Sequence, residues 1–135
     1  MHDWEPPDAG RSPEGVTVLR VQGNSMLPAL RPADWIVVDL GRRPRFGDIA
    51  VAQREGGPLV SHRMVSVLPR RMQGDALDRV ERVAREELIG TAVAVVRHGE
   101  RTDLLKPRAR WHGRRVAART WCGLASTKAS RLLRG

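Results

Sequence analysis

Short apolar stretches recur along the first hundred residues, and each ends at glycine, proline or charged positions. β-Branched residues are frequent in these stretches, and such runs with close turn signals are typical of strands. The pattern predicts five strands, over residues 16–22, 35–40, 48–53, 59–68 and 88–99. The third and fourth strands are separated by "REGGP", which predicts a hairpin.

The segments between and after these strands carry weaker signals. Residues 69–75, "PRRMQGD", are predicted to form a loop, and residues 79–87 suit either a short helix or an irregular crossing. Between residues 114 and 134 apolar positions recur at helical spacing. One face of this predicted helix would hold Ala117, Trp121, Leu124, Ala125 and Leu132. That pattern fits a helix docked on the strands and also a helix lying in a membrane interface.

Many short strands followed by one helix predict a mainly β fold with a C-terminal basic amphipathic helix. The strands would form a coiled β-sheet or a partly open barrel. A length of 135 residues fits a single domain. We expect a flexible N-terminal segment over 1–15, which is rich in Pro, Gly and acidic residues, a β domain over 16–100 and a basic tail over 101–135.

The net charge of +9 lies in the tail. Residues 101–135 contain ten Lys or Arg and one Asp, whereas basic and acidic side chains balance in residues 1–100. Such a tail can be a solvated helix, or it can contact phosphate groups. An anionic membrane or partner surface is the favoured contact, and nucleic acid is the least favoured. The oligomeric state cannot be inferred from this pattern.

Several classes of protein are disfavoured by composition. The single cysteine, Cys122, excludes an internal disulfide, and the four scattered histidines do not predict a metal site. No secretory signal and no apolar run of membrane-spanning length is seen. We therefore expect a protein that is cytoplasmic or peripheral at the membrane and that needs no cofactor.

The candidate chemistry begins at "GNSMLP", residues 23–28, where Ser25 lies between a glycine turn and a proline. Ser25 can be a turn residue or a nucleophile, and a nucleophilic serine needs a base within hydrogen-bond reach. The only lysines, Lys106 and Lys128, lie among arginines in the tail, where a neutral amine is not expected. A histidine is therefore the candidate base.

His62 is the histidine that lies inside a predicted strand. Alternation along residues 59–68 puts it on the inward face and puts Ser61 and Arg63 on the other. An inward histidine is commonly a core residue, but imidazole is also the natural general base near neutral pH. A carboxylate should orient it, and spacing alone leaves open Asp34, Asp39, Asp48, Asp75, Asp78 and Glu81.

Five sequence boxes follow one another between about Val16 and Val96: "GNSMLPAL" with "RPADWIVVD", "RFGDIAVAQ", "GPLVSHRMV", "GDALD" and "LIGTAVAV". In this order they resemble the serine peptidases of the signal peptidase I and LexA-like superfamily (S24/S26 type). The resemblance implies the coiled, partly open β fold of that superfamily. It also implies that Ser25 is the nucleophile and that His62 occupies the general-base position. Histidine there, instead of lysine, resembles the archaeal and endoplasmic-reticulum type of signal peptidase, here as a small anchorless member.

The same branch has a "GDNN" turn with a second aspartate several residues later, and this chain reads "GDALDRVERV". The resemblance therefore implies Asp75 as the essential turn aspartate. Asp78 is its rival for direct contact with His62, at a shorter spacing than in that branch, and Glu81 is the less favoured match for the second aspartate.

The leading hypothesis is a serine endopeptidase that processes a peptide or precursor protein through an acyl-enzyme. The substrate would be an extended peptide added along a strand edge. Self-cleavage in the LexA-like manner, at Ala9-Gly10, is a second hypothesis. A non-catalytic module that binds anionic lipid or nucleic acid through residues 101–135 is a third. Cys122 as an arginine-activated nucleophile is the least favoured alternative.

Overall fold

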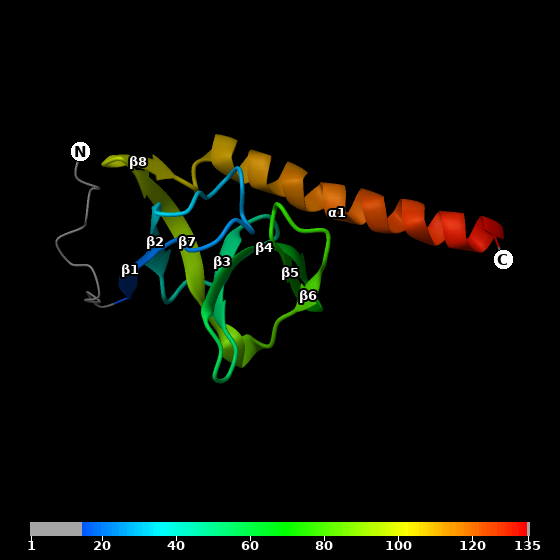
Figure 1. The fold of residues 1–135 in the computed structure, drawn as a ribbon, viewed down its shortest axis with the longest axis horizontal. Coiled ribbons are helices and arrows are strands. Elements are labelled where there is room, and N and C mark those ends of the chain that lie inside the picture. The colour runs from blue at the N-terminus through cyan, green and yellow to red at the C-terminus, as the bar shows by residue number, and fades with distance from the viewer. Residues whose placement is uncertain (1–14, 135) are drawn as a thin grey trace.

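The computed structural model describes residues 15–134, with the side chains of residues 15–120 (Figure 1). Short strands dominate it, and one long helix follows them. In chain order the elements are β1 (Val16–Arg20), β2 (Trp35–Asp39), β3 (Ile49–Gln53), β4 (Leu59–Val67), β5 (Arg70–Gln73), β6 (Glu81–Arg82), a 3₁₀ turn (Arg85–Glu87), β7 (Leu88–Arg97), β8 (Glu100–Asp103) and α1 (Pro107–Arg134).

The strands form one antiparallel sheet that is open and not closed into a barrel. Its order is β1-β2-β7-β3-β4-β5-β6, and β8 pairs with β7 off this path. β7 therefore lies between β2 and β3, which follow each other in the sequence, and this later strand joins β1 and β2 to the rest of the sheet. The predicted mainly β fold with one C-terminal helix is confirmed.

Each of the five predicted strands is present, but three further strands, β5, β6 and β8, were not predicted. Residues 69–75 contain β5, whose sequence "RRMQ" has no β-branched residue. Pairing with β4 makes it a strand, because the register sets Met72 beside Met64 and buries both. The ambiguous residues 79–87 form β6 and the 3₁₀ turn. β8 reads "ERTD", which is too polar and exposed to resemble a strand, and it forms by pairing with β7.

β4 is buried on both faces over residues 62–66. One face packs into a core with Ala50, Ala52 and Met72, and the other lies beneath α1, which contacts β4. The helix approaches closely because a Cβ on Gly113 would collide with the carbonyl oxygen of Gly47. The described part of α1 therefore docks on the sheet, as one of the two predicted arrangements requires.

Some predictions concern residues that the structure does not describe. The flexible segment lies almost entirely within residues 1–14, and the predicted apolar face of the helix includes side chains beyond residue 120. The division of the chain at residue 100 stays a prediction, and β8 carries the sheet through Asp103. Within the described residues, no helix combines the length and the apolarity of a membrane span.

Candidate active site

Ser25 lies in the loop between β1 and β2, and both ends of that loop are fixed. The Val21 N–H donates to the Asp34 carbonyl at 2.8 Å, and the Ala33 N–H donates to the Val21 carbonyl at 3.1 Å. Gly23 has a φ of 78°, which suits glycine because it lacks a Cβ. Met26, next to Ser25, is buried in the core. The serine is therefore held on a loop with a defined shape.

Three aspartates that composition left open as partners of His62 serve the backbone instead. The Arg31 N–H donates to Asp34, the Gly41 N–H to Asp39 and the Arg45 N–H to Asp48. Asp34 also binds the Arg97 guanidinium at 2.7 Å. Burial raises the pKa of Asp34, but these hydrogen bonds outweigh burial and leave that pKa below its ordinary value. These carboxylates act as turn caps and as an anchor for the loop that carries Ser25.

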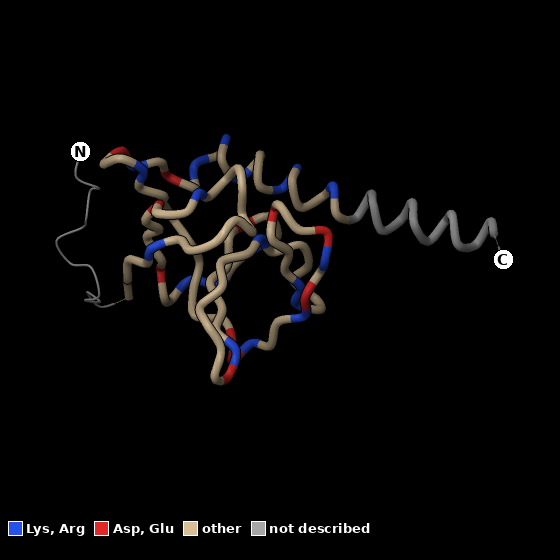
Figure 2. Tube along the Cα trace, in the orientation of Figure 1, with Lys and Arg blue, Asp and Glu red and all other residues tan. Residues whose placement is uncertain are grey.

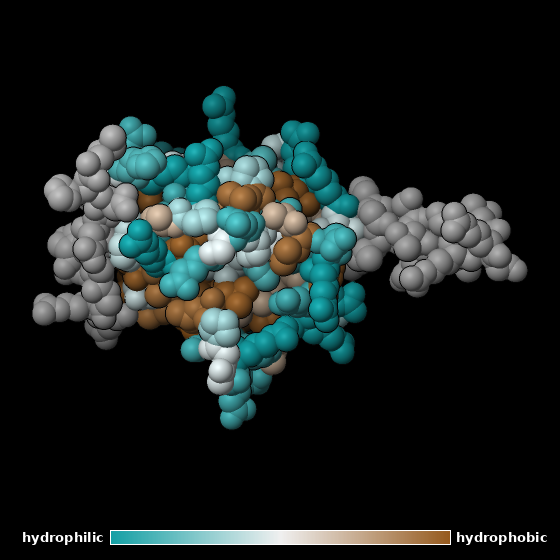
Figure 3. All heavy atoms as spheres, viewed as in Figure 1, coloured by the Kyte–Doolittle hydropathy of each residue, from teal (hydrophilic) through white to brown (hydrophobic). Residues whose placement is uncertain are grey.

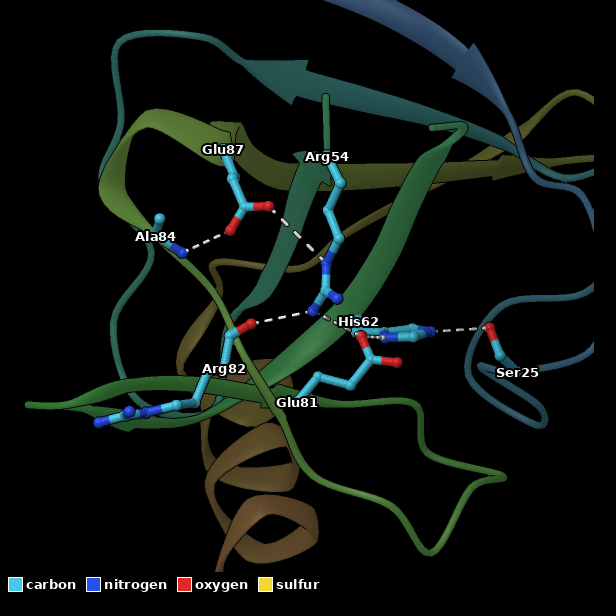
Figure 4. A network of polar contacts seen from close by, with 7 residues as sticks. All are labelled: Ser25, Arg54, His62, Glu81, Arg82, Ala84 and Glu87. Atoms are coloured by element: carbon cyan, nitrogen blue, oxygen red, sulfur yellow. Dashed lines mark hydrogen bonds and ion pairs between the residues drawn. The ribbon is translucent and has the colours of Figure 1, made fainter. Parts of the chain in front are cut away.

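Ser25 and His62 meet across the sheet. His62 Nε2 lies 3.2 Å from Ser25 Oγ, and the His62 side chain points toward the serine in Figure 4. The histidine comes from β4 and is 5% exposed. If the Ser25 hydroxyl donates to Nε2, the ring proton must reside on Nδ1. The structure thus brings together the two side chains that the sequence singled out.

Glu81 is the carboxylate that contacts the other side of the ring. One of its oxygens lies 3.9 Å from His62 Nδ1, which is longer than a hydrogen bond. Nδ1 is buried and has no hydrogen-bond partner among the described residues. Glu81 comes from β6 and lies 3.6 Å from the Arg54 guanidinium, which also lies 3.7 Å from Glu87 (Figure 4). Arg54 further donates to the Arg82 carbonyl at 2.9 Å.

The environment keeps His62 neutral. Burial lowers the pKa of His62, since the charged ring is poorly solvated there. The negative charges of Glu81 and Asp75 raise that pKa and Arg54 lowers it, and the net result lies below the ordinary value of 6.5. An imidazole that is neutral near pH 7 can accept the proton of a serine hydroxyl.

Asp75 is bound to Arg63 and does not contact the His62 ring. The Arg63 guanidinium donates twice to this carboxylate, at 2.8 and 2.6 Å, and both side chains are 6% exposed. Arg63 also donates to the Gly47 carbonyl at 2.9 Å, beneath α1. Arg63 does point away from the His62 face, as alternation predicted, but it is buried because the helix covers that face.

The turn that contains Asp75 nevertheless supports Ser25. The Ala76 N–H donates to the Ser25 carbonyl at 2.9 Å, and the Asp75 N–H lies 3.4 Å from Met26 Sδ. Gly74 lies so close to the Ser25 carbonyl that a Cβ there would collide with it. The Arg63–Asp75 pair therefore ties the strand that carries His62 to the backbone of Ser25. This ion pair therefore helps to position Ser25 relative to His62.

Asp78 lies elsewhere. It is exposed and lines a cavity of about 420 Å³ between the 74–80 loop, β5 and α1, which neither Ser25 nor His62 lines. Of the two carboxylates that the sequence favoured, Asp75 is thus paired with Arg63 and Asp78 lines a separate cavity. Glu81, the less favoured match, faces the histidine.

The family of the chain follows from a comparison with known families. A family model described as Peptidase S24-like matches residues 2–71, more than half of the chain. This chain belongs to the Peptidase S24-like family. Membership supports a protease in general, either a serine peptidase or a self-cleaving protein of the LexA-like kind. No curated protein matches the chain.

In this Peptidase S24-like chain, the matched region contains Ser25 and His62 but ends before Asp75, Asp78 and Glu81. The carboxylate partner is therefore the part of the site that family membership leaves open. Cys122 and the Ala9-Gly10 dipeptide lie outside the described side chains. Within the part of the chain that is described, no group of His, Cys, Asp and Glu could hold a metal ion.

The Peptidase S24-like site opens into a cleft of about 490 Å³ beside Ser25 and His62. One wall is formed by residues 19–23, at the end of β1, and the other by residues 58–62, at the start of β4. Among the described strands β1 pairs only with β2, and residues 59–62 of β4 pair only with β3 because β5 ends at Gln73, opposite Arg63. Unpaired strand edges therefore border both sides of the cleft.

Proposed function

We propose that this Peptidase S24-like chain is a serine endopeptidase in which Ser25 is the nucleophile and His62 is the general base. The observation that carries the proposal is the 3.2 Å contact between Ser25 Oγ and the neutral, buried ring of His62. His62 Nε2 takes the hydroxyl proton as Ser25 Oγ attacks the peptide carbonyl. The proton then passes to the leaving amine, and water hydrolyses the acyl-enzyme by the reverse path.

Two groups would stabilise the charges that form. Glu81 faces the Nδ1 side of the ring and favours the imidazolium, and a shortening of its 3.9 Å contact would give Nδ1–H an acceptor. The Ser25 N–H has no hydrogen-bond partner in the described part of the chain, so it is available to the tetrahedral oxyanion. No cofactor is required for this chemistry.

The proposed substrate is an extended peptide or the extended segment of a precursor protein, as in signal-peptidase-like processing. Its backbone would lie in the cleft as an added strand, and the edges of β1 and β4 would supply hydrogen bonds. Apolar side chains such as Leu19, Val60 and Leu59 line this cleft and favour small or apolar substrate residues. LexA-like self-cleavage remains a prediction of the sequence.

Covalent labelling with a fluorophosphonate probe tests the proposal without a known substrate. We expect one probe per chain, located at Ser25 by peptide mapping. The His62→Ala variant should lose labelling because its serine has no base. The intact-mass spectrum of the same incubations reports self-cleavage at Ala9-Gly10. Labelling that persists unchanged in His62→Ala, or that maps to another residue, would overturn the assigned mechanism.

The role of Glu81 predicts a specific pH profile. In the wild type the labelling rate should rise with pH through the pKa of His62, below 6.5, and then level off. Glu81→Gln removes a charge that raises this pKa, so the rising limb should move to lower pH. The plateau rate should fall about 10- to 100-fold, less than the roughly 10⁴-fold effect of replacing a triad aspartate by its amide. Labelling rates measured between acid and neutral pH provide the test.

The matched control is Glu86→Gln, since Glu86 is exposed on the neighbouring 3₁₀ turn. Its profile should coincide with that of the wild type. If Glu81 only stabilises the fold, Glu81→Gln should reduce the fraction of protein that is labelled but should not shift the rising limb of the pH profile. That result would refute the assignment of Glu81 as the residue that positions His62.

A further inference from the structure

The turn between β4 and β5 exposes apolar side chains at its tip. Val67 pairs with Arg70, and Leu68 lies at the turn between them. Leu68 is 88% exposed and Val67 is 43% exposed. Isolated exposed apolar residues are ordinary on protein surfaces. The surroundings of this pair are what make it unusual.

A cavity of about 420 Å³ adjoins the tip, and its lining is chemically divided. Four arginines line it, and no acidic residue does; the remaining lining is glycine, proline and apolar side chains such as Leu40, Leu88 and Ile89. The arginines are Arg42, Arg43, Arg70 and Arg85. They come from three segments that line this cavity together with Leu68, namely the β2–β3 loop, the β4–β5 turn with the first residue of β5, and the 3₁₀ turn.

These four guanidinium groups lack the carboxylate partners that three arginines of the sheet have. Arg54, Arg63 and Arg97 each form an ion pair with a carboxylate. None of the four forms an ion pair or a side-chain hydrogen bond with any residue in the described part of the chain. The tip therefore combines uncompensated positive charge with an exposed leucine, although residues 1–100 as a whole are balanced in charge.

This combination matches an anionic lipid surface. Guanidinium groups bind phosphate oxygens in a bidentate manner, and basic residues near such a surface are attracted to it. An apolar side chain beside these basic residues is stabilised when it is buried at the boundary between the lipid headgroups and the acyl chains. A free phosphate would satisfy the arginines but would give Leu68 no apolar surroundings. Figure 3 shows hydrophobic residues (brown) bordered by hydrophilic ones (teal) on one face of the molecule, so surfaces of mixed hydropathy are present elsewhere. The feature that distinguishes the tip is its group of arginines.

We propose that the β4–β5 turn and its arginines, Arg42, Arg43, Arg70 and Arg85, dock the protein on an anionic phospholipid surface. The guanidinium groups contact lipid phosphates, and Leu68 inserts between headgroups. This surface, here called the arginine tip, shares no lining residue with the cleft beside Ser25. The proposal is therefore independent of the peptidase chemistry. It also differs from the predicted role of the basic tail, which would place the contact on α1.

Co-sedimentation with vesicles tests the arginine tip in the full-length protein. Vesicles of phosphatidylcholine alone are compared with vesicles that also contain phosphatidylglycerol. We expect binding only to the anionic vesicles, with a decrease between low salt and about 0.15 M salt. Each arginine should contribute about fivefold to the partition coefficient. The double variant Arg43→Glu/Arg70→Glu should therefore bind at least about 25-fold more weakly, and Leu68→Asp should also bind more weakly.

Two controls match these changes. Arg114→Glu/Arg115→Glu alters net charge equally on an exposed part of α1, where Figure 2 marks basic positions and no acidic one. Leu77→Asp places the same charge on a different exposed leucine. Both controls should bind nearly as the wild type does. Equal losses in the two double variants would mean that net charge alone drives binding, and a loss only in the α1 variant would assign the contact to the tail. Either result overturns the proposal.

Insertion of the tip can be followed separately from affinity. An environment-sensitive fluorophore on Leu68→Cys, in a Cys122→Ser background, should brighten with anionic vesicles, whereas the same fluorophore on Leu77→Cys should not. Inorganic phosphate is added as a competitor. If phosphate displaces the protein and Leu68→Asp binds normally, the site takes free phosphate and lipid docking is refuted. An unchanged fluorophore signal at Leu68→Cys on vesicles that do bind the protein also refutes it.

Discussion

The Ser25→Ala protein is expected to be folded and to have lost peptide hydrolysis by a factor on the order of 10⁶ in kcat. The alanine removes the only atom that can form the acyl-enzyme, and the neutral base opposite it then has nothing to activate. His62→Ala should cause a similar loss, because residues that act as a unit have non-additive effects. Hydrolysis of a synthetic peptide library, read by mass spectrometry, measures the change.

Ser61→Ala is the matched control for this loss. Ser61 precedes the base on β4 and lines the same cleft, but His62 Nε2 contacts Ser25. Ser61→Ala should hydrolyse peptides at a rate close to that of the wild type. Equal cleavage by Ser25→Ala and the wild type would show that the observed pair does not carry the reaction.

Removal of the Asp75 carboxylate is expected to destabilise the protein by about 3–5 kcal/mol. Asp75→Ala leaves Arg63 without its partner at a position where 6% of its side chain is exposed, and a buried unpaired charge is costly. The free energy of unfolding, obtained from urea denaturation, should fall by that amount. Asp78→Ala is the control, because Asp78 is exposed and its removal should change stability by less than about 0.5 kcal/mol.

The same pair of variants separates a positional role of Asp75 from a catalytic one. If Asp75 acts directly on His62, Asp75→Ala should keep its stability and lose probe labelling. If it acts through Arg63, the loss of labelling should follow the loss of folded protein and recover when folding is favoured by low temperature or osmolyte. A stable but unreactive Asp75→Ala protein would contradict the role that its bond to Arg63 indicates.

The sequence singled out Ser25 and His62 as candidates for a physical reason, and the resemblance implied their roles as nucleophile and base. Ser25 lies in a distinctive turn, and His62 lies in a strand whose alternation sets its direction, so both depend on local pattern. The five strands likewise follow from β-branched runs. Local pattern is the part of a structure that a single sequence expresses most directly.

The carboxylate that faces His62 was not predictable in this way. Its identity depends on β5, which contains no β-branched residue and exists because pairing with β4 buries Met72. β6 pairs with β5, and this two-residue strand carries Glu81 to the histidine. The burial of the Arg63–Asp75 pair also depends on α1, because the helix covers Arg63. Spacing in "GDALDRVERV" contains none of this information.

The position of β7 in the sheet has a consequence for biosynthesis. β1 and β2 flank the loop with Ser25, and β3 and β4 carry His62, yet in the described sheet these two pairs are hydrogen-bonded to each other only through β7. A ribosome completes β7 at Arg97, long after it has made both reactive side chains. The strand that joins the hairpins of Ser25 and His62 in the sheet is therefore made after both residues. The proposed reactivity depends on this later part of the chain.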